Sequence, residues 1–80
     1  MYFVLSIHFV LFFSMVKFGD RLRQAREAKK LTQYQLADLL NVNQITISTW
    51  ERGTREPSIE MIRKISLALD CSLNFLFGID

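Results

Sequence analysis

The chain has 80 residues, half of them apolar, which is room for one domain with a small core. Ten basic and eight acidic residues give a net charge of +2, which is too small to indicate a nucleic-acid partner by itself. A single cysteine and a single histidine exclude an intramolecular disulfide and a zinc site built from Cys ligands, so we expect a reducing, cytoplasmic setting.

The first 16 residues, MYFVLSIHFVLFFSMV, carry no charged side chain. The stretch is shorter than the roughly 20 apolar residues that span a membrane, and it lacks the basic start and the small-residue cleavage site of a secretory signal. Three interpretations stay open. It is an upstream extension with Met15 as the natural start, an apolar segment that packs on the domain or pairs two subunits, or, least favoured, a membrane anchor. We treat 1–16 as an extension of uncertain role and predict the domain over 17–80.

From Phe18 onward the pattern is helical. Apolar residues recur at spacings of three and four and predict one face of a first helix, which ends near Lys30. This face consists of Phe18, Leu22, Ala25 and Ala28. Thr32 is the predicted N-cap of a second helix, and Gln35 completes a capping box. Its predicted apolar face is Leu36, Ala37, Leu39 and Leu40. The helix ends at Asn41, a residue that tolerates a left-handed conformation.

A third helix begins after Asn43, a predicted N-cap, and ends at Gly53. Ile47 and Trp50 lie three residues apart on its inner side. Two short helices joined by a turn of three or four residues cross at a steep angle, and Ala37 supplies the small residue that this crossing requires. The segment 33–52 therefore has the pattern of a helix-turn-helix, which apolar side chains lock together. These are Leu36, Leu40, Val42, Ile47 and Trp50.

Two further helices follow a loop over 54–57. Ser58 caps the fourth helix, and its core candidates are Ile59, Ile62, Ile65, Leu67 and Leu69. Ser72 begins a short fifth helix that Gly78 closes, with Leu73, Leu76 and Phe77 facing inward. Because no segment alternates like a half-buried strand, we predict an all-α domain of five short helices around one core.

The outer face of the third helix carries amides, hydroxyls and one aliphatic side chain, and it is poor in acids. Its members are Gln44, Ile45, Ser48, Thr49 and Arg52. Glutamine can pair with N6 and N7 of adenine in the major groove, and aliphatic or threonine methyl groups can contact the thymine methyl. Such a face is suited to the edges of DNA bases.

These features resemble the Cro/C1-type (XRE-like) helix-turn-helix family of phage repressors and bacterial regulators. The matching stretches, in order and with the family's spacing, are Thr32-Gln33, Leu36-Ala37, Ile47-Ser48, Trp50-Glu51-Arg52-Gly53, Pro57-Ser58 and Leu67-Ala68-Leu69. The resemblance covers residues 18–77 and implies a five-helix lambda-repressor-like domain that reads double-stranded DNA with helix 44–52. The sequence departs from the family at Asn41, where glycine is usual, and in its apolar N-terminus.

The resemblance also implies roles for single residues. Gln33 corresponds to a glutamine that touches a phosphate and braces the recognition-helix glutamine, here Gln44, which matches the adenine-reading position. Positions that contact bases or nearby phosphates in relatives are occupied by Asn43, Ile45, Ser48 and Thr49. Arg52 and Arg55 lie where relatives reach the DNA backbone.

Arg26 and Glu51 match a pair that in this family joins the first helix to the recognition helix. We expect a buried salt bridge between them that holds the recognition helix without touching DNA. A separate prediction concerns the last helix, where Phe75, Phe77 and Ile79 leave more apolar surface than a small core needs. That helix is therefore the preferred dimer surface.

We predict a homodimeric transcriptional regulator, by resemblance a repressor, that binds an inverted-repeat operator. Two alternatives stay open: an antitoxin-like or other protein-interaction module that also binds DNA, and a regulator tethered to a membrane by residues 1–16. All three share the DNA-binding core. The sequence has no glycine-rich phosphate loop, paired catalytic carboxylates or Ser/Cys–His arrangement, so we expect no enzyme, no cofactor and no metal site.

Overall fold

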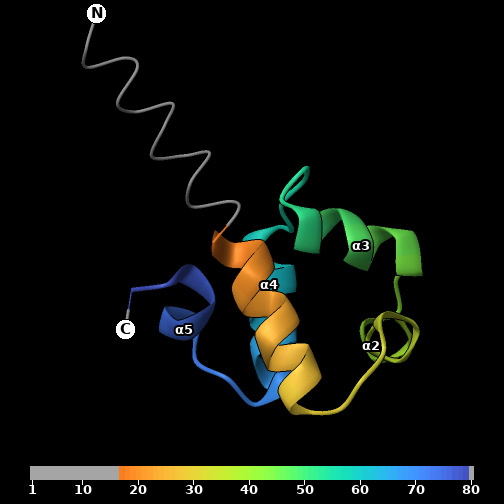
Figure 1. The fold of residues 1–80 in the computed structure, drawn as a ribbon, viewed down its shortest axis with the longest axis horizontal. Helices are drawn as coiled ribbons and strands as arrows, with labels where there is room; N and C mark the ends of the chain where they lie inside the picture. The colour runs from red at the N-terminus through yellow and green to blue at the C-terminus, as the bar shows by residue number, and fades with distance from the viewer. Residues whose placement is uncertain (1–16, 80) are drawn as a thin grey trace, which may run out of the picture.

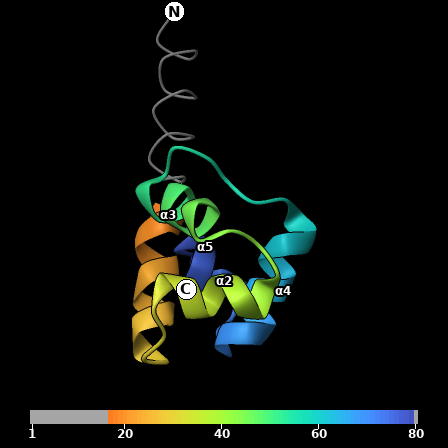
Figure 2. The same ribbon diagram turned by 90° about the vertical axis from the view of Figure 1, so that its right-hand side faces the viewer.

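The computed structural model of the chain describes residues 17–79, and the interpretations of residues 1–16 lie outside this part. Every regular element within it is a helix (Figures 1 and 2). A first helix over residues 17–28 is followed by α2 (Gln33–Leu40), α3 (Gln44–Arg52), α4 (Ile59–Leu69) and α5 (Leu73–Phe77). The predicted all-α fold with five helices is confirmed.

The helices begin and end where short-range chemistry dictates. The predicted N-caps Thr32, Asn43, Ser58 and Ser72 each accept a hydrogen bond from a backbone N–H in the first turn of their helix. At α2 the Gln35 side chain accepts in turn from the backbone N–H of Thr32 at 2.9 Å, so the capping box is confirmed. Asn41 ends α2 in the left-handed conformation, with φ of 57°. Gly53 and Gly78 do the same for α3 and α5.

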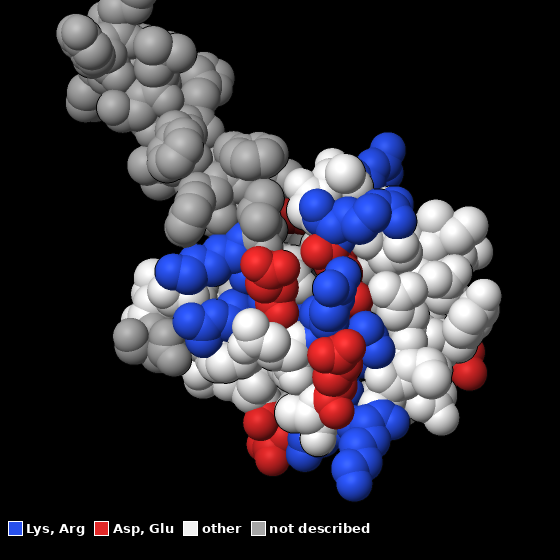
Figure 3. Space-filling view, viewed as in Figure 1, with Lys and Arg blue, Asp and Glu red and all other residues white. Residues whose placement is uncertain are grey.

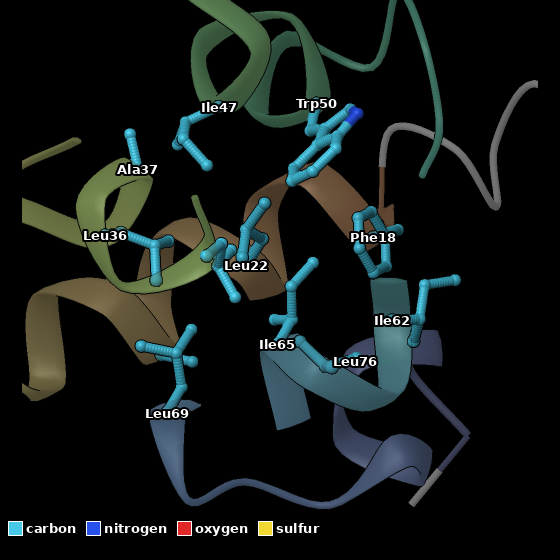
Figure 4. Close-up of a cluster of buried hydrophobic side chains, with 12 residues drawn as sticks. Phe18, Leu22, Leu36, Ala37, Ile47, Trp50, Ile62, Ile65, Leu69 and Leu76 are labelled. Atoms are coloured by element: carbon cyan, nitrogen blue, oxygen red, sulfur yellow. The ribbon is translucent and has the colours of Figure 1, made fainter. Parts of the chain in front are cut away.

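One apolar core lies between the helices, and Figure 4 shows side chains from all five of them converging on it. The largest side chains that are fully buried are Leu22, Leu36, Ile47, Ile65, Leu69 and Leu76. Full burial of each such side chain contributes about 1.5–3 kcal/mol. Because a five-residue helix such as α5 is not stable alone, this packing, rather than helix propensity, holds the short helices in place.

Six residues that the sequence placed in the core are exposed, and for them the prediction was wrong. They are Ala28, Leu39, Ile59, Leu67, Leu73 and Phe77. Each helix contacts the core along a single stripe, and on α4 this stripe runs through Ile62, Ile65 and Leu69. Leu67 lies on the opposite side of α4 and is 83% exposed. Hydrophobicity alone did not identify which apolar residues share the covered stripe.

The crossing of α2 and α3 sets the direction of α3. In Figure 1, α2 is seen end-on while α3 lies across the view, so the two helices cross steeply. Ala37 is 3% exposed and lies beside Ile47 at the crossing (Figure 4). The predicted locking residues are buried, except that Val42 is half-buried against the core.

The first helix approaches the end of α3 closely. A Cβ atom at Gly19 would lie 2.4 Å from the carbonyl oxygen of Glu51, so only glycine fits there. The α3 helix is therefore fixed at its beginning by α2 and at its end by the first helix. Within residues 17–79 no helix combines the length and the apolar character needed to cross a membrane.

Candidate nucleic-acid interface

A buried ion pair joins the first helix to the end of α3. The Nε of Arg26 donates to Oε2 of Glu51 at 2.6 Å, and its Nη2 donates to Oε1 at 3.1 Å. The side chain of Glu51 is 1% exposed and that of Arg26 is 11% exposed. Nη1 of Arg26 donates to the carbonyl oxygen of Leu31 at 2.7 Å, which also ties the loop before α2 to this pair. The expected salt bridge is present in the structure.

The surroundings of Glu51 keep its carboxylate ionised. Burial alone would raise the pKa of Glu51, but hydrogen bonds from Arg26 and Gln33, the charge of Arg26 and a hydrogen bond from Arg23 lower it below its ordinary value. The hydrogen bond to Glu51 raises the pKa of Arg26 against the effect of its burial. Both groups are therefore charged near neutral pH, and within residues 17–79 every buried side-chain nitrogen or oxygen has a hydrogen-bond partner.

A chain of hydrogen bonds runs from this ion pair to the start of α3. Nε2 of Gln33, the first residue of α2, donates to Oε1 of Glu51 at 3.0 Å. Oε1 of Gln33 accepts from Nε2 of Gln44, the first residue of α3, at 2.7 Å. The side chain of Gln44 is half-buried, and its bond to Gln33 links it to the buried Glu51.

The rest of the outer face of α3 is more loosely held. Ile45 is 64% exposed and Arg52 is exposed, while Ser48 and Thr49 are half-buried. Arg52 donates to the hydroxyl of Ser48 one turn earlier, and the hydroxyl of Thr49 donates to the carbonyl oxygen of Thr46 at 2.8 Å. Both bonds join groups of α3 itself, so they do not tie Arg52, Ser48 or Thr49 to the core or to another helix.

The helix-turn-helix family model matches residues 22–76. The chain belongs to the helix-turn-helix family. Its curated relatives include the uncharacterised HTH-type transcriptional regulator YqaE of Bacillus subtilis (strain 168), which is 39% identical over 59 residues. These residues are 74% of this chain and 51% of the relative, so the chain spans about half the length of that regulator.

Two solved structures resemble the helix-turn-helix chain over most of its length. The crystal structure of the restriction-modification controller protein C.AhdI from Aeromonas hydrophila is 43% identical, with a TM-score of 0.73. The P22 c2 repressor, crystallised in complex with a synthetic operator, is 36% identical, with a TM-score of 0.73. Each match covers 79% of this chain and 96% of the other. The predicted family and fold are thereby confirmed.

The helix-turn-helix brings most of the predicted site residues onto one side of α3. Oδ1 of Asn43 accepts from the backbone N–H of Ile45 at 2.7 Å, so this oxygen caps the start of α3. Arg55 lies in the exposed loop after α3, where it lines an open cleft of about 570 Å³ with Thr46 and Thr49. The predicted set is thus spatially contiguous at α3 and extends into the following loop.

Charge is distributed differently over the helix-turn-helix and the first helix. Figure 3 shows basic and acidic side chains mixed along the first helix, whereas the surface over α2 and α3 on the right of that view is largely uncharged. Any contact that this surface makes would therefore rely on uncharged side chains more than on a basic patch.

Two residues that position the helix-turn-helix were not found from the sequence. Gly19 permits the close approach of the first helix, and Arg23, at 3.5 Å, is a further and half-exposed partner of Glu51. A glycine within an otherwise helical pattern was the available signal for the first of these. Within residues 17–79 no three His, Cys, Asp or Glu side chains gather into a group that could hold a metal ion.

Proposed function

We propose that this helix-turn-helix chain binds double-stranded DNA sequence-specifically and regulates transcription, with α3 in the major groove. The observation that carries the proposal is the placement of Gln44. It stands at the start of α3 on a face without exposed acids, its amide is held by Gln33, and the exposed Ile45 lies beside it. An amide matches the edge of adenine, and an aliphatic side chain matches the thymine methyl group.

The other residues of the interface divide by their position. Ser48, Thr49 and Asn43 lie along α3 where they contact bases or adjacent phosphates. Arg52 and Arg55, both exposed at and after the end of α3, neutralise backbone phosphates. Phosphate contacts of this kind position the protein, whereas the contacts of Gln44 and Ile45 specify the sequence.

We also propose that two copies bind an inverted repeat, one half-site for each copy. Apolar side chains remain exposed near the end of α4, on α5 and just after α5, and α5 lies on the far side of the first helix from α2 (Figure 1). They are Leu67, Leu73, Phe77 and Ile79. Phe75, named from the sequence with this surface, is half-buried against the chain's own core. The dimer surface is therefore centred on the exposed set.

We propose that the chain acts as a repressor, a role that its likeness to the P22 c2 repressor supports. The chain then works in the cytoplasm as a regulator without catalytic activity and without a cofactor. Its single cysteine supports that location, and the lack of any catalytic motif in its sequence supports the absence of an enzyme activity.

Selection of binding sites from a random pool of double-stranded DNA tests the proposal directly. The full chain is expected to enrich a palindromic site, and Gln44→Ala is expected to lose about 1–3 kcal/mol at one A·T pair in each half-site. Gln24→Ala, which alters an exposed glutamine of the first helix, serves as the matched control and leaves the site unchanged. If the chain enriches no site and binds DNA only weakly and in a salt-sensitive way, the proposal fails.

A further inference from the structure

The network behind α3 starts from a group that can accept hydrogen bonds but cannot donate them. The carboxylate of Glu51 is ionised and buried, and its Oε1 lies 3.0 Å from the side-chain nitrogen of Gln33. If the amide of Gln33 were reversed, two oxygens would face each other at this distance with no hydrogen between them. The carboxylate therefore fixes which end of the Gln33 amide points toward it.

The orientation of Gln33 is passed on to Gln44. With its nitrogen held by Glu51, Gln33 presents Oε1 to the nitrogen of Gln44 at 2.7 Å. Reversal of the Gln44 amide would again place two oxygens together, so Gln44 must donate one N–H inward. It is left with one N–H and with its Oε1 for an external partner.

The groups left on Gln44 match only one of the two purines. Adenine offers an acceptor at N7 and a donor at N6, whereas guanine offers two acceptors, N7 and O6. A glutamine that could turn freely would satisfy guanine by directing both of its N–H groups outward. A glutamine that donates one N–H to Gln33 has only one N–H left, so it cannot satisfy both acceptors of guanine.

We infer that Glu51 is a specificity-determining residue, which acts through Gln33 to fix the amide of Gln44 so that α3 selects adenine over guanine. Glu51 is a positioning residue because it lies beneath the surface and touches no base. The inference rests on the proposed function, since it specifies what the DNA-reading glutamine prefers and why.

The sharpest test is Glu51→Met. Methionine fills a similar space but offers no strong acceptor, so the amide of Gln33 is no longer held in one orientation by the residue at position 51. The amide of Gln44 can then turn as well and direct both of its N–H groups outward. The wild-type preference for A·T over G·C at this base pair, about tenfold for a bidentate contact, is expected to vanish or invert, while preferences at the neighbouring pairs stay unchanged. A folded variant that keeps the wild-type preference would overturn the inference.

Two variants that keep the Arg26–Glu51 pair guard against loss of the fold. Gln33→Lys can still donate to Glu51 but offers Gln44 no acceptor, and it is expected to lose the adenine preference. Arg23→Met removes the half-exposed partner of Glu51 and leaves the bond from Gln33 in place, so it is expected to retain that preference. Equal preferences in the two variants would overturn the inference.

Hydrogen exchange of the side-chain amides, followed by NMR on the free full chain, separates the inference from the proposed function. In the wild type, an Nε2 hydrogen of Gln44 is expected to exchange with solvent more slowly than those of the exposed Gln24, and Glu51→Met is expected to reduce this difference. Equal exchange in the wild type overturns the inference whether or not DNA is bound. Slow exchange without selective DNA binding leaves the amide orientation standing and refutes the proposed function.

Discussion

The surface at the start of α3 and the surface at the end of α4 are both accessible, but they are organised by different forces. At α3 the Gln44 amide is tied through Gln33 to the buried Glu51. At the end of α4, Leu67 and Leu73 line a mostly apolar hollow of about 220 Å³ and are 83% and 41% exposed. The first surface is held by directional bonds that reach the core, whereas the exposed leucines of the second make apolar contacts alone, with Arg63 and Ser66 beside them.

The kind of contact that a surface makes determines what it can recognise. A hydrogen-bonded group binds well only to partners whose donors and acceptors match its own. Replacing one such atom in the partner therefore weakens binding strongly. Apolar contact is non-directional and scales with the area removed from water. The α3 surface is thus suited to discrimination between bases, and the α4–α5 surface to association with another copy.

Removal of the anchor beneath α3 has the largest expected effect. Arg26→Met keeps the apolar stem of the side chain but leaves the carboxylate of Glu51 buried without its main partner. Breaking a buried pair in this way costs about 3–5 kcal/mol of unfolding free energy. Chemical denaturation monitored by circular dichroism measures the loss.

Arg23→Met is the matched control for this change. Arg23 contacts the same carboxylate, but its side chain is 52% exposed, so its removal is expected to cost less than about 1 kcal/mol. Equal losses of unfolding free energy in the two variants would show that the buried pair does not hold α3 in place.

Charged substitutions on the apolar surface are expected to weaken dimerisation without unfolding the chain. Leu67→Lys combined with Leu73→Lys is expected to weaken dimerisation by about a hundredfold, since two apolar contacts are lost from each copy. The unfolding free energy of the monomer should change by less than about 1 kcal/mol, because both positions are exposed.

Analytical ultracentrifugation measures this association. Leu39→Lys changes an exposed leucine of α2 and serves as the control that leaves the dimer intact. A Phe77 variant is less informative, because the ring of Phe77 packs against Phe18 with centroids 6.5 Å apart. An unchanged dimer in the double variant would remove Leu67 and Leu73 from the interface.

The pH dependence of stability gives the smallest expected change. The pKa of Glu51 is lowered in the folded chain, so its contribution to stability is complete above the ordinary carboxyl pKa of about 4.3 and is lost as the pH falls through the folded value. The difference in unfolding free energy between wild type and Glu51→Gln should therefore narrow on acidification, by no more than about 1.4 kcal/mol per pH unit. Urea titrations between neutral and acid pH measure it, and a constant difference would contradict the assignment.

Features that depend on neighbouring residues could be predicted from the sequence. The capping box at Thr32 and the left-handed end at Asn41 involve groups within a few residues of each other, so their chemistry is local. The exposure of Leu67 could not be predicted, because it depends on which side of α4 the other helices cover. An apolar residue opposite the covered stripe has the same hydrophobicity as one within it.

The site was predicted in part, and only through the resemblance to a family. The links Arg26–Glu51 and Gln33–Gln44 followed from matching positions, whereas the bond from Gln33 to Glu51 that joins them was not anticipated. That bond spans 18 residues of sequence and depends on the steep crossing of α2 and α3. No local pattern encodes it.

The division of α3 into two sides has a consequence for how such a protein changes over time. Everything that holds the helix in place comes from its caps and its inner side chains, among them Ile47 and Trp50. The outward Ile45 is exposed, and Ser48 and Arg52 bond only to each other. Replacements at these outward positions are therefore expected to leave the scaffold intact, and under the proposed function a handful of them would redirect the same fold to a new target.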